Sequence, residues 1–449
     1  MERQPDRPLG GARVTVPAGT DPYVPGHGDA SYSVGHYDLH LGYKVDRNRL
    51  DGDATLFCEA RGDVTALELD LHTLRPSKVF VDGRPVRHQH RRGRLVVRPP
   101  RRIPAGVEFE VRVRYAGNPR PVRSRILGTA GWEELEDGVL VASQPHGAPS
   151  WFPCNDRPDD KATYSLTLTA ASDYQVAFTG ELVDRRRGAS SATWMYEQEV
   201  PMATYLAAVQ IGRYDVTELE APVPMRSLTP QPPDSAGYDA AFGRQPEMMA
   251  YFQDAFGPYP FPSYTCVITH DDLEIPLESQ GMSTFGRNFM ADDWDCVRLV
   301  AHEMAHQWFG NAVTLGAWRD IWLHEGFACY AEWLWSEQSG AASTQTRVDH
   351  HHARLSELDE DLVIGDPGPR LMFDDRVYKR GALTLHALRC EVGDTTFFRL
   401  LRTWVEQHVG GTVSTRDFVA HTSAAAGRDL TALFDAWLYG AGLPPVPKL

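Results

Sequence analysis

The first half of the chain consists of short runs in which polar and apolar residues alternate. Residues 37–45, 109–115 and 164–169 each show this period of two, and glycine and proline interrupt the segments between them. Alternation of this kind is typical of strands that bury one face of a sheet. We therefore predict an all-β domain over residues 31–215, built from antiparallel, sandwich-like sheets.

The periodicity changes after about residue 216, where helical spacing of apolar residues takes over. A strand is predicted at residues 265–270, and helices are predicted at 245–256, 294–309, 327–338, 382–391 and 430–439. A few strands followed by several helices indicate a mixed α/β domain over residues 216–449. The whole chain is thus expected to be an α+β multidomain protein, and its 449 residues suffice for two or three sizeable cores.

The start of the chain differs from both of these regions. Residues 1–30 are polar and rich in proline and glycine, so we expect a flexible N-terminal tail. Residues 1–25 lack the apolar core of a secretory signal, and no segment reaches the roughly 18 apolar residues of a membrane helix. We therefore predict a protein without membrane association.

The cysteines and the net charge limit the compartment and the partners. The six cysteines form no C-x-x-C pair, so we expect reduced, mostly buried thiols in a cytoplasmic protein; they are Cys58, Cys154, Cys266, Cys296, Cys329 and Cys390. A net charge of −15 argues against nucleic acid as a partner.

One short motif carries most of the candidate chemistry. His302-Glu303-Met304-Ala305-His306 reads H-E-x-x-H, and residues four apart stand on one face of a helix. His302 and His306 can therefore direct two imidazoles at one metal ion, while Glu303 can reach a water molecule there without being a ligand. The apolar flanks predict a buried helix, in which these polar groups are costly unless they are paired or bind a metal.

A third ligand is needed to complete such a centre. Glu325 follows His306 with eighteen residues between them, and a catalytic zinc site takes three protein ligands and leaves one position open. Two histidines and a glutamate suit zinc, so we expect one zinc ion per chain. Asp320, five residues before Glu325, is a candidate carboxylate partner for a ligand histidine. The alternative is a surface helix with two unrelated histidines, which the apolar flanks and Glu325 disfavour.

The segment that contains these residues, 302–328, resembles the zinc core of the aminopeptidase N family, the gluzincin metalloaminopeptidases with the pattern H-E-x-x-H-x18-E. Residues 144–156 are similar to the segment that borders the family's substrate pocket, residues 377–383 to its Y-x-K-G segment, and residues 32–53 to its first strands. The resemblance implies a thermolysin-like catalytic domain. It also implies a zinc-dependent aminopeptidase that hydrolyses the N-terminal peptide bond of peptides through a metal-activated water.

The same resemblance implies roles for single residues. Glu303 would take the proton of the attacking water and pass it to the leaving amine. Tyr378 would donate a hydrogen bond to the tetrahedral oxyanion. Glu278 and Gln144 would hold the α-ammonium group of the substrate. The expected partners are therefore peptides with a free N-terminus.

Some positions depart from the family pattern. Residues 275–280 stand where the family has G-x-M-E-N, and we align Glu278 with that glutamate from its charge and its distance before the metal helix. His324 replaces a common asparagine and Arg380 a lysine, and neither is expected to be a ligand. The chain stops soon after Gly440, like the family's catalytic domain, so we expect a short form without the C-terminal helical domain and a cleft open on one side. The oligomeric state stays open.

Two other functions remain as alternatives at this stage. The first is a hydrolase of another small substrate, such as an epoxide or an amide, because a related leukotriene hydrolase shares this zinc core. The second is a scaffold protein that keeps the fold without the chemistry, which the complete set of Glu303, Tyr378 and metal ligands disfavours. A general endopeptidase is disfavoured by Glu278.

Two further groups of histidines invite a metal-binding interpretation. His88 and His90 share one face of a predicted strand, but neighbouring arginines would repel a cation, so we predict a solvated basic hairpin around Gly93. Residues 350–352 are three consecutive histidines, which point in different directions on a helix and cannot chelate one ion together. We expect them at the surface.

Overall fold

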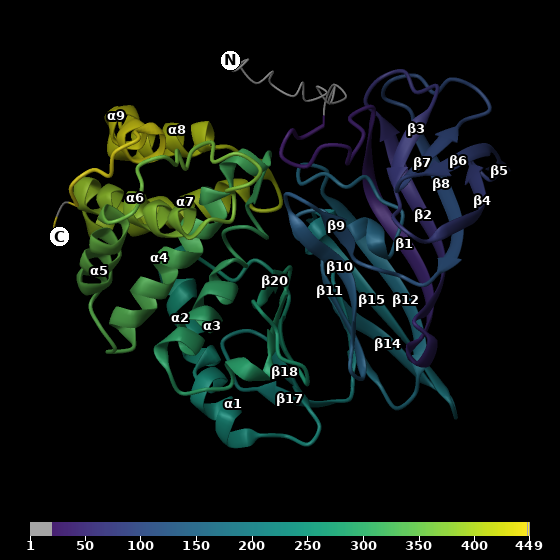
Figure 1. The fold of residues 1–449 in the computed structure, drawn as a ribbon, viewed down its shortest axis with the longest axis horizontal. Coiled ribbons are helices and arrows are strands. Elements are labelled where there is room, and N and C mark those ends of the chain that lie inside the picture. Colours follow the sequence, from purple (N-terminus) through teal and green to yellow (C-terminus); the bar gives the residue numbers. More distant parts are fainter. Residues whose placement is uncertain (1–19, 447, 449) are drawn as a thin grey trace, which may run out of the picture.

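The computed structural model describes residues 20–446 and residue 448. A β-rich half is followed by a half dominated by helices, and the two lie side by side (Figure 1). This order confirms the predicted α+β architecture. The sheet of the second half begins with strand β17, at Tyr214.

The largest sheet has eight strands in the order β14-β15-β12-β1-β2-β8-β4-β5. Buried and exposed residues alternate along its central strands, as the sequence pattern predicts. The sheet is antiparallel except for β1 and β12, which pair in parallel. Its strands are β1 (Tyr32–Lys44), β2 (Arg49–Ala60), β4 (Arg75–Val81), β5 (Arg84–Pro85), β8 (Glu108–Gly117), β12 (Ala162–Ala171), β14 (Glu181–Arg187) and β15 (Ser191–Met202).

Two smaller sheets complete the β-rich domain. One has the order β13-β16-β11-β10-β9, with β9 (Val122–Ser124), β10 (Gly128–Leu135), β11 (Gly138–Ala142), β13 (Gln175–Phe178) and β16 (Val209–Gly212). The other has the order β3-β7-β6, with β3 (Leu67–Asp70), β6 (Arg87–Arg91) and β7 (Arg94–Arg98). Strands β6 and β7 form the predicted basic hairpin around Gly93, in which His88 is exposed and His90 contacts the Leu71 carbonyl at 2.7 Å.

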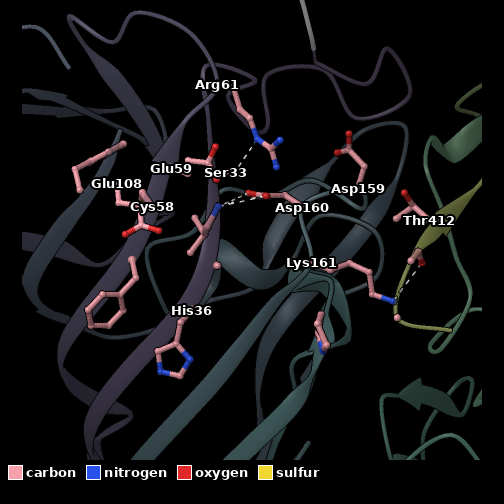
Figure 2. Close-up of a pocket in the computed structure, with 17 residues that line it drawn as sticks. Ser33, His36, Cys58, Glu59, Arg61, Glu108, Asp159, Asp160, Lys161 and Thr412 are labelled. Atoms are coloured by element: carbon pink, nitrogen blue, oxygen red, sulfur yellow. Dashed lines mark hydrogen bonds between the residues drawn. The ribbon is translucent and has the colours of Figure 1, made fainter. Parts of the chain in front are cut away.

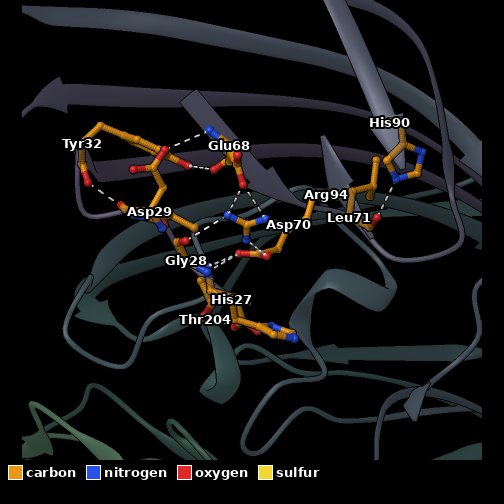
Figure 3. A network of polar contacts seen from close by, with 12 residues as sticks. His27, Gly28, Asp29, Tyr32, Glu68, Asp70, Leu71, His90, Arg94 and Thr204 are labelled. Carbon is orange, nitrogen blue, oxygen red and sulfur yellow. Dashed lines mark hydrogen bonds and ion pairs between the residues drawn. The ribbon is translucent and has the colours of Figure 1, made fainter. Parts of the chain in front are cut away.

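Residues 20–30 differ from the flexible tail that the composition suggests. Tyr23 and Val24 are buried, and the Asp21 carboxylate accepts a hydrogen bond of 2.7 Å from the Trp318 N–H of the second domain. The Gly28 N–H donates to Asp70 at 2.8 Å, within a polar network that also contains Arg94 (Figure 3). Trp318 and Asp70, both far along the chain, hold this segment in place, and composition cannot reveal such contacts. Residues 1–19 of the predicted tail lie outside the described residues.

The second domain is built around a five-stranded sheet in the order β17-β18-β19-β21-β20. Its strands are β17 (Tyr214–Leu219), β18 (Met225–Pro230), β19 (Tyr264–Thr269), β20 (Leu277–Ser279) and β21 (Met282–Gly286), and β18, β19 and β21 run parallel. A two-stranded parallel ladder joins β22 (Thr314–Leu315) to β23 (Thr412–Val413). Every residue of β19 and β21 is buried, so neither strand shows alternation.

The helices of this domain cover the sheet and extend beyond it (Figure 1). They are α1 (Ser235–Phe242), α2 (Gln245–Phe256), α3 (Trp294–Ala305), α4 (Trp322–Gln338), α5 (Thr344–Ser356), α6 (Asp375–Val392), α7 (Asp394–His408), α8 (Thr415–Ala426) and α9 (Thr431–Phe434), the last continued by a π-helical turn (Asp435–Tyr439). The predicted helices are present, although the sequence pattern did not indicate α1, α5, α7 or α8. Of the three histidines in α5, only His350 is exposed, because His351 stacks on Trp333 and His352 contacts the Pro444 carbonyl.

The metal helix is shorter than predicted. Helix α3 ends at Ala305 rather than at residue 309, because the chain turns directly after His306. Gly310 has a φ of 134°, a backbone conformation that favours glycine. The N–H of Asn311 then bonds back to the His306 carbonyl at 3.0 Å.

The cysteines and the lengths of the helices bear on the expectations of reduced thiols and of a chain without a membrane helix. The six cysteines form no disulfide in the part of the chain that the structure describes, and four of them are buried. Within residues 20–446 and 448, the structure contains no helix long and apolar enough to cross a lipid bilayer.

Candidate active site

Helix α3 supplies two of the predicted metal ligands. It is capped by Asp293, whose side chain accepts a hydrogen bond of 2.9 Å from the Cys296 N–H, and it buries its last turn. His302 and His306 are one turn apart, and their ring centroids are 4.8 Å apart. Their side chains are 7% and 2% exposed, so both imidazoles are removed from bulk water.

The third predicted ligand comes from helix α4. Glu325 Oε2 lies 3.4 Å from the Nε2 atoms of both His302 and His306. One atom from each of the three residues falls within a mutual distance of 4.8 Å. Two buried imidazole nitrogens and a buried carboxylate around one point are the donor set of a catalytic zinc centre, so these residues fit the ion.

Two glycines allow the helices to place these groups. A methyl group at Gly326 would lie only 2.8 Å from the backbone of Gly381 on α6. Helices α4 and α6 therefore touch backbone to backbone beside Glu325 and Tyr378. Larger residues would separate the helices and move both functional side chains.

The outer nitrogens of the two histidines have partners of different kinds. His302 Nδ1 donates to Glu332 Oε1 at 2.7 Å, and His306 Nδ1 donates to the Phe309 carbonyl at 3.0 Å. Such bonds fix the tautomer that presents Nε2 to a metal. The prediction that Asp320 plays this part is wrong, since its carboxylate accepts hydrogen bonds from the N–H and hydroxyl of Thr415 instead.

Glu332 is a functional residue that the sequence reasoning missed. It is 1% exposed and lies two turns after Glu325 on the same face of α4. Although burial alone would raise the pKa of its carboxyl, the nearby charge of Lys379 and the hydrogen bond to His302 lower that pKa to about 2. Arg298 also approaches Glu332 at 3.4 Å. Glu332 is thus a charged partner for His302, and the seven-residue spacing from Glu325 is the signal that could have identified it.

Glu303 points a carboxylate into the same region. It is 4% exposed, and within the described part of the chain its Oε2 atom is buried without a hydrogen-bond partner. Burial raises the pKa of Glu303 above its ordinary value. A buried, unsatisfied carboxylate oxygen beside three metal ligands is suited to exchange a proton with a bound molecule.

Two tyrosines border the ligands from different elements. Tyr378 of α6 stacks on His302, with ring centroids 6.0 Å apart and planes inclined by 16°. Tyr205, from the β-rich domain, packs edge-on against Trp318, and its buried hydroxyl has no partner within residues 20–446 and 448. Burial holds the pKa of both phenols well above the usual value, so both are hydrogen-bond donors at neutral pH. The sequence indicated Tyr378, whereas nothing in it indicated Tyr205.

Glu278 and Gln144 meet across the two domains. Glu278 lies on β20 and accepts a hydrogen bond of 2.5 Å from Gln144 Nε2, from the loop after β11. Burial raises the pKa of Glu278, and His306 and Glu325 are close enough to influence it. Glu278 and Gln144 therefore lie beside the predicted metal ligands.

The two departures at His324 and Arg380 have structural explanations. His324 Nε2 accepts a hydrogen bond of 2.9 Å from the Leu315 N–H, and burial lowers the pKa of this histidine to about 3. The Arg380 guanidinium donates to backbone carbonyls around the π-helical turn and the segment after it, at Trp437, Ala436, Gly440, Ala441 and Gly442. As expected, neither side chain is placed among the metal ligands.

Comparison with known proteins relates both halves of the chain to one family. The Peptidase M1 N-terminal domain matches residues 33–206, and the Peptidase family M1 domain matches residues 240–437. Among curated relatives, probable aminopeptidase 1 of Sulfurisphaera tokodaii is 25% identical over 92% of this chain and 54% of its own length. Aminopeptidase N of Lactococcus lactis is 28% identical over 67% of this chain and 38% of its own length. The chain thus spans about half or less of these curated relatives.

Solved structures match over almost their full length. The M1 zinc metallopeptidase from Deinococcus radiodurans is 31% identical, with a TM-score of 0.87, and the match covers 95% of this chain and 99% of that one. A mutant of the same protein bound to a Tyr-Ser-Ala substrate matches with a TM-score of 0.88. A two-domain M1 zinc metallopeptidase mutant bound to L-arginine also matches, with a TM-score of 0.88.

Proposed function

The chain belongs to the M1 peptidase family, and on this premise we propose that it is a zinc-dependent aminopeptidase that removes single residues from the N-termini of peptides. The observation that carries the proposal is the position of Glu278, a partly buried carboxylate bonded to Gln144 beside the metal ligands. A second carboxylate next to a His-His-Glu centre offers a counter-charge for an ammonium group. The substrate-bound and amino-acid-bound relatives support the same substrate class.

His302, His306 and Glu325 are proposed to hold the zinc. Zinc bound by these residues would supply a Lewis acid for the scissile carbonyl and would increase the acidity of water. Glu303 is proposed as the general base, because its Oε2 atom is buried, has no hydrogen-bond partner among the described residues and belongs to the residue next to a ligand. The same carboxyl group returns the proton to the leaving amine.

Tyr378 is proposed to stabilise the oxyanion of the tetrahedral intermediate. It remains protonated at neutral pH, and its ring is held against His302. A phenol that keeps its proton can donate a hydrogen bond to oxygen as negative charge develops. Its contribution should therefore appear in the rate of the chemical step.

Glu278 and Gln144 are proposed to select for a free N-terminus. Glu278 supplies the negative charge, and Gln144 Nε2 orients that carboxylate while its own amide oxygen can accept a hydrogen bond from the ammonium. An acetylated N-terminus lacks the positive charge and leaves Glu278 without a counter-charge. Discrimination against blocked peptides follows.

The experiment compares free and N-acetylated aminoacyl fluorogenic amides, with and without a chelator. Glu303→Gln should retain zinc and lower kcat by about 10²–10⁴-fold, and Tyr378→Phe should lower kcat by about 10²-fold or more with little change in KM. Glu278→Ala should raise KM for free-amino substrates about tenfold or more, while Glu274→Ala, at an exposed position in the segment before β20, is the matched control. Equal cleavage of free and blocked substrates by the unmodified protein would refute the exopeptidase proposal.

We also propose that the protein acts in the cytoplasm. The six cysteines form no disulfide within the described residues, which supports this proposal because disulfides are rare in a reducing compartment. Fractionation of the source cells with a specific antibody tests it, and recovery from the extracellular medium would contradict it.

A further inference from the structure

Lys161 lies at the boundary between the two domains. It directly precedes β12 of the large sheet, and it extends toward the segment of the second domain that carries Thr412 (Figure 2). Its Nζ atom donates to the carbonyl of Asn311 at 3.0 Å, to that of Ala312 at 3.3 Å and to the Thr314 hydroxyl at 2.9 Å. A longer contact of 3.5 Å reaches the Gly411 carbonyl. All four acceptors belong to the second domain.

None of these four acceptors carries a charge. The neighbouring carboxylates have other partners, since Asp160 accepts from the Val34 N–H and the Asn155 side chain, and Asp159 pairs with Arg157. Burial lowers the pKa of the Lys161 ammonium to about 7. A partly buried cation of this kind is stabilised by its hydrogen bonds to neutral groups. Replacing the ammonium therefore removes these hydrogen bonds rather than an ion pair.

The ammonium meets the second domain where two of its segments cross. The Gly410 N–H donates to the Ala312 carbonyl at 2.8 Å, and the Thr314 N–H donates to the Gly411 carbonyl at 3.2 Å, next to the β22–β23 ladder. Lys161 bonds to both segments at this crossing. A groove of about 720 Å³ between the domains opens beside it. The lysine therefore joins the β-rich domain to the loop that follows the metal helix.

That loop is connected in turn to the proposed amine-binding residue. The Asn311 side chain donates to the Ser279 carbonyl at 3.1 Å, and Ser279 follows Glu278 on β20. The Asn311 N–H bonds to the carbonyl of His306, one of the metal ligands. One residue, Asn311, thus links the Lys161 ammonium to the end of the metal helix and to the strand of Glu278.

We propose that Lys161 is a positioning residue that holds Asn311 from the opposite domain and thereby sets Glu278 against the metal centre for recognition of the substrate's amino group. The inference rests on the proposed function, because it assigns Lys161 to the amine-binding part of that site. Lys161 itself touches no substrate. Its effect is transmitted through Asn311 and Ser279.

The test combines Lys161→Met, which keeps the length of the side chain and removes its donors, with Glu278→Ala in a double-mutant cycle. Lys161→Met should raise KM for free-amino substrates about tenfold, the change expected from losing one buried charge-assisted contact, while kcat changes little. In the Glu278→Ala background the same substitution should change KM much less. Lys78→Met, at an exposed position of the same domain, is the matched control and should leave KM unchanged.

Hydrogen exchange supplies a readout that does not depend on activity. Lys161→Met should increase amide exchange in residues 310–316 and in residues 277–281. If Lys161→Met fails to fold, Thr314→Val takes its place; this variant removes one acceptor and should increase the same exchange to a smaller extent. Equal effects of Lys161→Met with and without Glu278, or unchanged exchange in residues 277–281, would overturn the inference. Absence of any aminopeptidase activity in the unmodified protein would instead overturn the proposed function, and the exchange result would still decide whether Lys161 positions β20.

Discussion

Replacement of Glu332 tests the geometry of the metal centre most directly. Its Oε1 atom accepts the 2.7 Å hydrogen bond from His302 Nδ1, and the residue is 1% exposed. Glu332→Gln keeps an oxygen acceptor and loses the negative charge, whereas Glu332→Ala loses both. Because Arg298 and Lys379 face this carboxylate, the alanine variant also leaves buried positive charge without its partner.

The expected magnitude follows from the loss of an oriented, charged partner for a metal ligand. Such losses reduce metal affinity by about 10–100-fold, which corresponds to about 1.4–2.7 kcal/mol. We expect Glu332→Gln near the lower end and Glu332→Ala near the upper end. The alanine variant should also lose about 3 kcal/mol of folding stability from the uncompensated buried charge.

The assay is a competition for zinc between the protein and a chelator of known affinity, after circular dichroism has established that each variant is folded. Asp320→Asn is the matched control, because Asp320 is the carboxylate that sequence spacing suggested and its observed partner is Thr415. This variant should leave zinc affinity unchanged. Zinc affinity of Glu332→Ala equal to that of the unmodified protein, or an equal loss in Asp320→Asn, would refute the reasoning.

Three further predictions concern stability. Arg380→Lys should lower the free energy of unfolding by about 2–4 kcal/mol, because an ammonium cannot reproduce the guanidinium's bonds to five carbonyls; urea denaturation measures this, and unchanged stability would contradict it. Burial lowers the pKa of His146 from 6.5 to about 4, so the unfolded chain binds the extra proton first and stability should fall as pH drops from 6.5 to 4. His146→Phe should remove that one-proton slope from the unfolding free energy, and a slope equal to that of the unmodified protein would count against it. Free zinc at about 100 times its dissociation constant should stabilise the fold by about 2.7 kcal/mol, seen as a higher thermal midpoint that Glu325→Ala abolishes; a midpoint independent of zinc would exclude a site built into the native state.

The local parts of the metal centre could be read from the sequence. The spacing of His302 and His306 places two imidazoles on one helical face whatever the rest of the chain does, since that geometry is a property of the helix. The alternation in residues 37–45 likewise indicated β1 because period two is intrinsic to a strand. The end of α3 was less predictable, because Gly310 turns the chain in a conformation that the apolar pattern does not record.

Contacts between distant segments were decided by the tertiary structure. Asp320 and Glu332 both lie within seven residues of Glu325, and the sequence favoured the wrong one. The packing of α3 on α4 decides which carboxylate faces His302, and no local spacing reports that packing. The position of residues 20–30 depends in the same way on a contact between Asp21 and Trp318, nearly 300 positions later.

The sequence by itself determined the metal-binding helix, the identity of its donors and the division into a β-rich and a helical half. Only the tertiary structure brought Gln144 to Glu278, 134 positions apart, and joined Lys161 to Asn311 across the domains. The physical reason is the range of the forces involved. Helical and strand periodicities arise between near neighbours along the chain, whereas buried hydrogen bonds depend on which surfaces exclude water together, and that is settled only when the whole chain has packed.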